Sequence, residues 1–178
     1  MKPPTAPTKS ENAGWAYVAL GSNLGQPTHI VQQAMAQLQQ LSPGPLLRSS
    51  LWRSDPVDCP PGSPAFVNAV AGFQVWPTET PESLLANLQR IEVAFGRRPK
   101  TVLNEPRHLD LDLIAFGQAQ LSTAALVLPH PRAHRRRFVL QPLAEIAPNL
   151  VLPGQSSSVS ALLAALPPGE RVTKLRPP

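Results

Sequence analysis

The sequence predicts an α+β domain built around one antiparallel sheet. Short apolar segments rich in β-forming residues alternate with two longer segments whose apolar residues recur every three to four positions. Together they follow the order strand, helix, strand, strand, helix, strand. This order is the ferredoxin-like βαββαβ plan, with both helices on one face of the sheet. A small C-terminal α/β extension is expected to follow this core.

The first strand and helix are separated by a glycine-containing turn. Residues 15–20 predict a short apolar strand, which ends in Gly21-Ser22-Asn23-Leu24-Gly25. A helix near residues 27–41 follows, and its apolar positions, beginning with Ile30 and Ala34, keep the helical period. This apolar face is expected to pack against the sheet.

The middle of the chain predicts two strands and the second helix. Residues 46–54 and 65–76 form the strands, and the proline-rich segment 55–64 is the loop between them. Thr80 is expected to cap the second helix, with a proline at its first position and Gly96 just past its end.

The last strand of the core carries two carboxylates. Residues 109–114 read Leu-Asp-Leu-Asp-Leu-Ile, and side chains on a strand point alternately to its two faces. The leucines should therefore face the helices, while Asp110 and Asp112 stand on the open face of the sheet. Phe66 and Asn68, from the 65–76 strand, are expected on the same open face.

The C-terminal part predicts packing elements and no chemistry. An apolar helix near residues 139–146 is followed by a short strand at 150–152, a short helix at 159–166 and a final strand at 172–175.

Length and composition limit the class of protein. The chain has 178 residues, enough for one domain with a full core, which we expect over residues 15–176 after a disordered tail at 1–14. A single cysteine and the lack of a signal peptide or membrane span lead us to expect a cytoplasmic protein. We expect a monomer, because the modest surface hydrophobicity gives no argument for an obligate dimer. Sixteen Lys and Arg against eleven Asp and Glu give a net charge of +5, which favours an anionic partner.

The pair of aspartates is the strongest functional signal. Two like charges at this spacing repel each other and resist burial. Mg²⁺ relieves both problems, because it commonly binds one or two carboxylates together with substrate phosphates. From the spacing alone, an edge strand with one solvated face is an equally good interpretation. Arg107, three residues before Asp110, shifts the balance toward phosphate chemistry.

Five segments, in order along residues 16–153, carry a resemblance to a known family. They are Ala19-Leu20-Gly21-Ser22-Asn23-Leu24-Gly25, Phe66-Val67-Asn68-Ala69-Val70, Gln89-Arg90-Ile91-Glu92, Pro106-Arg107-His108-Leu109-Asp110-Leu111-Asp112 and Pro129-His130-Pro131. The combination resembles 6-hydroxymethyl-7,8-dihydropterin pyrophosphokinase of folate biosynthesis. The resemblance implies a ferredoxin-like fold and transfer of pyrophosphate from ATP to the hydroxymethyl oxygen of the pterin, with release of AMP.

The resemblance also implies roles for individual residues. Asp110 and Asp112 are expected to hold two Mg²⁺ ions that bridge the ATP phosphates, and the pterin hydroxyl, polarised by one metal, to attack the β-phosphorus in line. The residues expected to be catalytic are Asp110, Asp112, Arg97 and Arg107. Those expected to bind ATP are Gln89, Glu92, Arg107, Leu113, His130, Arg132 and Arg136. Those expected to contact the pterin are Ser54, Pro56, Val57, Phe66, Asn68, Asp110 and Phe138.

Several of these residues have simpler interpretations when the resemblance is set aside. Gln89 and Glu92 lie three apart on the second helix, which also fits a solvated helix face. Phe66 and Phe138 also suit a hydrophobic core. Asn68 within an apolar strand is harder to explain in this way, because an unsatisfied buried amide costs free energy.

The sequence departs from the family pattern in several places, most clearly in the loop before Pro106. Asn104 and Glu105 stand where some members have tryptophan and glycine, and Pro99 stands where some have an arginine that moves over the phosphates. We expect altered affinity for ATP and an unaltered reaction. The loops 55–64 and 97–105 flank the expected site and are predicted to close over both substrates.

Two other functional classes fit the fold. An RNA-binding module would stack bases on exposed strand aromatics, but Asp110 and Asp112 on that face would repel a phosphate backbone. A nucleotide-binding module without catalysis is the second alternative, and the intact acid pair with Arg107 argues against it. The expected partners are therefore ATP and the pterin, with no nucleic acid and no membrane.

Overall fold

The structure is a computed structural model that describes residues 14–97 and 106–176. Its strands are β1 (Trp15–Ser22), β2 (Leu47–Arg48), β3 (Trp52–Ser54), β4 (Phe66–Gln74), β5 (Asp110–Phe116), β6 (Leu121–Ser122), β7 (Val127–Leu128) and β8 (Val172–Lys174). Its helices are α1 (Pro27–Gln39), α2 (Pro81–Ala94), α3 (Arg137–Ile146) and α4 (Val159–Ala165), with a 3-10 turn at Ala133–Arg135. The predicted tail, apart from Gly14, lies outside the described residues, and so do Pro99, Asn104 and Glu105.

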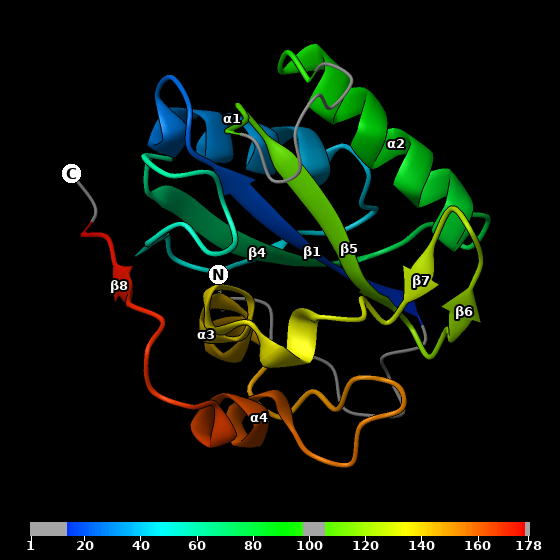
Figure 1. The fold of residues 1–178 in the computed structure, drawn as a ribbon. Helices are drawn as coiled ribbons and strands as arrows, with labels where there is room; N and C mark the ends of the chain where they lie inside the picture. The colour runs from blue at the N-terminus through cyan, green and yellow to red at the C-terminus, as the bar shows by residue number, and fades with distance from the viewer. Residues whose placement is uncertain (1–13, 98–105, 177–178) are drawn as a thin grey trace.

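The predicted core topology is confirmed. In the described part of the chain, six strands form one sheet in the order β5-β1-β4-β3-β8, and β2 also pairs with β4. β1 lies between β4 and β5 and is antiparallel to both. Helices α1 and α2 lie together on one face of this sheet, and α3 and α4 lie on the other (Figure 1).

The ends of α2 follow directly from its sequence. The Thr80 hydroxyl accepts the backbone N–H of Ser83, while the Ser83 hydroxyl accepts the N–H of Thr80, so the pair forms a capping box. Pro81 occupies the first helical turn, where its missing N–H costs nothing. Gly96 follows the helix with a φ of +88°, a left-handed conformation that favours glycine and ends the helix.

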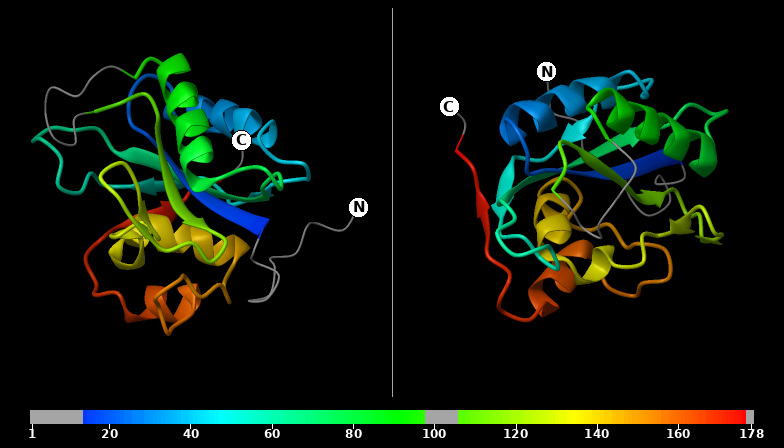
Figure 2. Two further views of the ribbon diagram at one scale, coloured as in Figure 1. Left: turned by 90° about the vertical axis from the view of Figure 1, so that its right-hand side faces the viewer. Right: turned by 45° about the horizontal axis from the view of Figure 1, so that its top comes forward.

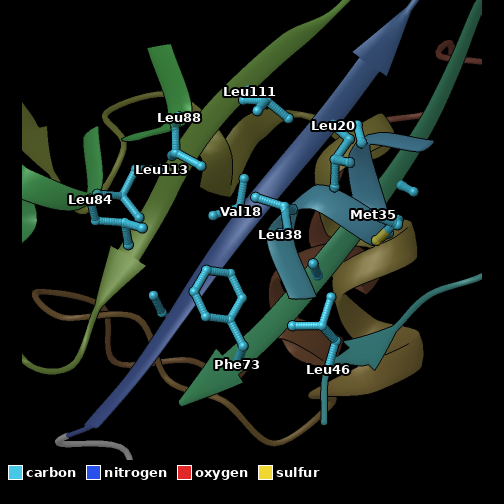
Figure 3. Close-up of a cluster of buried hydrophobic side chains, with 14 of the residues drawn as sticks. Val18, Leu20, Met35, Leu38, Leu46, Phe73, Leu84, Leu88, Leu111 and Leu113 are labelled. Carbon is cyan, nitrogen blue, oxygen red and sulfur yellow. The ribbon is translucent and has the colours of Figure 1, made fainter. Parts of the chain in front are cut away.

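The main hydrophobic core lies between the sheet and helices α1 and α2 (Figure 3). Leu111 and Leu113 of β5 point into this core, as predicted, and pack with Leu84 and Leu88 of α2. The alternation along β5 then sends Asp110 and Asp112 to the opposite face of the sheet.

The opposite face is only partly open, which corrects the expectation of an uncovered face. Tyr17, Val70 and Ile114 are buried there against a second core that includes Leu140 and Leu143 of α3. Figure 2 shows α3 directly beneath the sheet and α4 beneath α3. These apolar sheet residues need a cover, and α3 provides it, so only the end of the face that carries the aspartates is left as a pocket.

The predicted strand 46–54 is broken into β2 and β3. The backbone N–H of Ser49 donates to Val70 O at 3.0 Å, but the N–H of Val70 donates to the Ser49 hydroxyl at 2.9 Å. A side chain thus replaces a backbone carbonyl in the ladder, and the strand kinks at this point.

Two smaller elements differ from the prediction. Residues 150–152 form no strand: the N–H of Leu150 donates to Ala147 O after the end of α3, and Leu152 is buried in the second core. Strands β6 and β7 form a separate short hairpin that was not predicted. Within residues 14–97 and 106–176, no helix combines the length and apolar character needed to cross a membrane.

Candidate active site

A pocket opens where β1 ends, on the face of the sheet that α3 covers only in part. It is lined by side chains from the sheet, from the loop after β3 and from the basic segments before β5 and α3. The lining residues are Ala19, Leu20, Gly21, Ser54, Asp55, Val57, Cys59, Phe66, Asn68, Arg97, Arg107, Asp110, Asp112, His130, Arg132, Arg136, Phe138 and Val139. Four arginines face three aspartates in this set, so the pocket is polar and positively biased.

The sheet register fixes the floor of the pocket. Gly21 of β1 lies opposite Asp110 on β5 and opposite Asn68 on β4. Neighbouring strands are about 4.8 Å apart, so Asp110 and Asn68 stand about 10 Å apart across the glycine. A Cβ atom on Gly21 would lie 3.5 Å from Asn68 Oδ1 and 3.8 Å from a ring carbon of Phe66. The missing side chain therefore leaves the space between these groups open.

Asp110 is already surrounded by positive charge. Its Oδ1 lies 3.3 Å from Nη1 of Arg107 and 3.8 Å from Nη1 of Arg97. Nε of Arg107 is buried and has no hydrogen-bond partner among the described residues. The N–H of this atom is therefore available to donate a hydrogen bond to an anionic ligand in this corner of the pocket.

Arg136 is the second cationic centre of the pocket. Burial lowers the pKa of its guanidinium, and Arg132 lowers it further, while Asp112 and Asp110 act in the opposite direction. Its Cζ atom lies 5.3 Å from the ring centroid of Phe138. A partly buried cation beside another cation is a favourable place for a phosphate group.

The turn after β1 fixes the segment that carries Arg107. The Asn23 side chain is buried, and its Oδ1 accepts the N–H of Arg107 at 2.9 Å while its backbone N–H donates to Arg107 O at 3.2 Å. Its Nδ2 donates to Pro64 O at 3.3 Å, at the end of the proline-rich loop. Asn23 thus joins two flanks of the pocket, a role that sequence reasoning missed. The position of this amide within the turn between Gly21 and Gly25 is the sequence signal that could have indicated the role.

Asn68 is held by Ser54. Its Nδ2 donates to the Ser54 hydroxyl at 2.8 Å, and a longer contact of 3.5 Å reaches Trp52 O. The Asn68 Oδ1 lies toward Gly21 and the pocket. Asn68 therefore presents an acceptor to a ligand, as expected for recognition of a heterocycle edge.

Glu92 is buried, with 1% of its surface exposed, whereas Gln89 on the same helix is exposed. Its Oε1 accepts the N–H of Leu111 at 2.8 Å, and its carboxylate forms an ion pair with Arg97. Burial raises the pKa of Glu92, although the Leu111 N–H and Arg97 act in the opposite direction. Glu92 continues the buried stripe of Leu84 and Leu88 at four-residue spacing, and this signal could have placed it.

Replacing Glu92 with alanine is expected to lower the free energy of unfolding by about 2 kcal/mol, because the N–H of Leu111, between the two aspartates, loses its acceptor. Urea denaturation measures the change. Gln89→Ala is the matched control and should change stability by less than about 0.5 kcal/mol, since Gln89 is exposed on the same helix. Equal stability of the Glu92→Ala and wild-type proteins would contradict this assignment.

His130 is a neutral donor to the pocket in the free protein. Its backbone N–H donates to Ile114 O at 2.9 Å, and its Nδ1 accepts the N–H of Arg132 at 3.2 Å. Burial lowers the pKa of His130 to about 4, and Arg136 and Arg132 contribute in the same direction. The proton of the neutral ring therefore resides on Nε2.

His130 is expected to remain neutral in the free protein until the pH falls to about 4. Its ordinary pKa is 6.5, so the unfolded state binds more protons between these values. The stability that neutral His130 contributes is complete above pH 6.5 and is lost as the pH falls through 4. An NMR titration of the ring, assigned with a His130→Gln variant, measures this pKa. A midpoint near 6.5 would contradict the prediction.

Most predicted site residues meet at the pocket, and four do not line it. Those that line it are Ser54, Val57, Phe66, Asn68, Arg97, Arg107, Asp110, Asp112, His130, Arg132, Arg136 and Phe138. Leu113 packs in the main core, Gln89 is exposed on α2, and Glu92 reaches the site only through Arg97 and β5. Pro56 borders a neighbouring depression. The binding and catalytic roles of the whole set remain predictions.

The two aspartates fit Mg²⁺ in donor type and placement, since both carboxylates line the same pocket beside basic groups. No cluster of three or more His, Cys, Asp or Glu suited to a metal ion occurs in the described ranges. A site formed by two carboxylates therefore needs further oxygen ligands, which substrate phosphates can supply.

Comparison with known proteins places this chain in a family. Residues 17–148 match the model of the 7,8-dihydro-6-hydroxymethylpterin-pyrophosphokinase (HPPK) family. The 2-amino-4-hydroxy-6-hydroxymethyldihydropteridine pyrophosphokinase of Pseudomonas aeruginosa is 41% identical over 152 residues, which cover 85% of this chain and 91% of that protein. The Haemophilus influenzae protein of the same name is 43% identical over 140 residues, which cover 78% of this chain and 84% of that protein.

A solved structure confirms the fold. An HPPK-DHPS crystallised in complex with substrates is similar over 85% of this chain, with a TM-score of 0.68 and 11% sequence identity. The chain spans 43% of that longer protein, so this similarity supports the fold alone. The family match and the two bacterial relatives cover most of the chain. The chain belongs to the 7,8-dihydro-6-hydroxymethylpterin-pyrophosphokinase family.

Proposed function

We propose that this chain transfers the pyrophosphoryl group of ATP to the hydroxymethyl group of 6-hydroxymethyl-7,8-dihydropterin. The observation that carries the proposal is the shared pocket, in which Asp110 lies across Gly21 of β1 from Asn68 and Asp112 lines the same cavity. The hydroxymethyl oxygen forms a bond to the β-phosphorus of ATP and releases its proton to the solvent. The bond from that phosphorus to the α–β bridging oxygen breaks, and AMP leaves.

The basic side of the pocket is suited to the triphosphate. Arg107 and Arg97 lie beside Asp110, and Arg136 approaches from the start of α3. Neutral His130 can donate from Nε2 without adding charge. These donors hold the phosphates in place and offset charge that shifts during transfer, and positioning is the main source of catalysis in such reactions.

Asp110 and Asp112 would hold two Mg²⁺ ions, which when bound neutralise phosphate charge and polarise the attacking hydroxyl. Asp110 would then exchange part of its contact with Arg107 and Arg97 for the metal. That exchange would leave both guanidinium groups available to the phosphates.

The opposite side of the pocket is suited to a flat heterocycle. Asn68 offers its Oδ1, and Phe66 and Phe138 offer ring surface, all within the same lining. Ser54 fixes the Asn68 amide, so the acceptor is oriented before the ligand arrives. Gly21 leaves the intervening space free.

We propose that the protein acts as a monomer in the cytoplasm on ATP and the pterin, without a nucleic-acid partner. A single cysteine fits a reducing compartment. The two carboxylates in the pocket disfavour a nucleic-acid backbone more than they disfavour a metal-bound nucleotide.

The decisive test is the identity of the nucleotide product. Incubation of the protein with ATP, Mg²⁺ and the hydroxymethyl dihydropterin should yield AMP and the pterin diphosphate in equal amounts, and chelation of the metal should stop the reaction. Formation of ADP, or nucleotide consumption that does not depend on the pterin, would overturn the proposal. AMP formation that persists after metal removal would overturn the metal assignment alone.

A further inference from the structure

A carboxylate outside the pocket joins helix α3 to the strands that form the pocket wall. Glu145 lies near the end of α3 and accepts four hydrogen bonds. The donors are Ser50 N at 2.8 Å, Ser50 Oγ at 2.7 Å, Trp52 Nε1 at 3.2 Å and Lys174 Nζ at 2.7 Å. These donors come from the kink after β2, from β3 and from β8. One side chain thus connects four parts of the fold.

These contacts stabilise the charged form of the Glu145 carboxylate. Its side chain is 27% exposed, so it is shielded from much of the solvent. Burial on its own would raise the pKa of Glu145, but the bonds from Lys174, Ser50 and Trp52 outweigh it, and the pKa is lowered. Lys174 also lies 5.8 Å from the ring centroid of Trp52. Charge-assisted bonds of this kind are stronger than neutral ones.

β3 is short, so few backbone hydrogen bonds fix its position. The strand has three residues, and the kink at Ser49 separates it from β2. Its hydrogen-bonded neighbours are β4 and the equally short β8, which Lys174 ties to the same carboxylate. A three-residue strand next to a kink has few ladder bonds to fix its position, so side-chain anchors contribute a large share.

One row of paired residues across the sheet connects the contacts of Glu145 with the pocket. Lys174 pairs with Trp52, and Trp52 pairs with Asn68, which lies next to Gly21 in the floor of the pocket. Trp52 and Ser54 are two residues apart, so both point to the same face. Ser54 is the residue that holds the Asn68 amide. A shift of β3 would therefore move the acceptor that the pocket presents.

We infer that Glu145 is a positioning residue for the pterin: it holds β3 in place, so that Ser54 orients Asn68. This inference rests on the proposed function. The aspartates and Arg107 have separate anchors in Glu92 and Asn23, which do not involve β3. Loss of Glu145 should consequently weaken the pterin side of the site and spare the ATP side.

The test compares Glu145→Ala with Ser54→Ala and the double variant. We expect each single variant to raise KM for the pterin about tenfold, with KM for ATP within about twofold of wild type. The double variant should be no worse than the poorer single variant, because both act through one chain of contacts. Glu145→Gln, which keeps the shape and one acceptor oxygen, should show a smaller rise and covers the case in which Glu145→Ala fails to fold. Glu82→Ala, at an exposed acid of α2, is the matched control.

The outcomes separate the inference from the proposed function. Equal rises in both KM values, additive effects in the double variant, or a wild-type KM for the pterin in folded Glu145→Ala would overturn the inference while the wild-type enzyme still forms AMP. Direct titration of the pterin onto each protein supplies the same comparison as dissociation constants. Wild-type protein that binds the pterin and forms no AMP would contradict the proposed function alone, and protein that does not bind the pterin would overturn both.

Discussion

Replacement of Asp110 or Asp112 with alanine is expected to leave a folded protein with less than about 1% of wild-type AMP formation. Both carboxylates line the pocket on the face away from the main core, so neither substitution creates a cavity in that core. Each removes one of the two carboxylates proposed to hold the metal, and no group of three or more His, Cys, Asp or Glu suited to a metal ion occurs in residues 14–97 and 106–176. The loss should appear in kcat, because charge neutralisation acts on the transferred group.

A set of matched variants tests this interpretation of the acid pair. Asp110→Asn keeps the shape of the side chain and removes its charge, and we expect it to be nearly as inactive as Asp110→Ala. Glu82→Ala removes an exposed acid from the first turn of α2 and should retain full activity. Thermal unfolding checks that each variant is folded. Near-normal turnover in folded Asp110→Ala would remove the metal-binding role from this residue.

Sequence patterns predicted the core of the fold because its elements depend on local rules. Period-two alternation along β5 placed Leu111 in the core and Asp110 on the other face, and the structure has both. The cap at Thr80 and the left-handed Gly96 set the ends of α2 within the chain itself. Each of these features needs only a few neighbouring residues, so a single sequence is sufficient to predict it.

The features that the sequence did not predict depend on contacts between distant residues. The break between β2 and β3 requires the Ser49 hydroxyl to meet the N–H of Val70. The partial cover of the second face requires α3 to return beneath β4. Residues so far apart leave no periodic signal, and the serine alone is common in strands and loops alike.

The residues of the candidate site also fall into two groups, those that local patterns predict and those that depend on distant contacts. Side chains that face the pocket from regular strands, such as Asp112 and Asn68, could be placed by alternation. Asn23 and Glu145 could not, because their partners lie 84 and 95 residues away along the chain. Both form hydrogen bonds to distant segments, and alternation along a strand gives no information about such bonds.

Replacement of Gly21 with alanine is expected to reduce kcat/KM about 100-fold without loss of stability. A Cβ at this position meets Asn68 Oδ1 at 3.5 Å and a ring carbon of Phe66 at 3.8 Å, which are ordinary contacts, so the free protein accommodates it. Alanine also loses less backbone entropy on folding than glycine does. The added methyl group occupies space between Asn68 and Asp110, where the pterin and its hydroxymethyl group are proposed to lie.

The combination of equal or greater stability with lost activity distinguishes a blocked pocket from a damaged fold. Gly14→Ala is the matched control, because a Cβ there has open space within 4 Å, and it should leave both activity and stability unchanged. In Gly21→Ala the loss should lie mainly in KM for the pterin, since the basic groups near Asp112 and His130 remain in place. A thermally stable Gly21→Ala enzyme with a wild-type KM for the pterin would show that the bound substrate does not lie over Gly21 of β1. The pterin would then have to bind on the loop side of the pocket, near Val57 and Cys59.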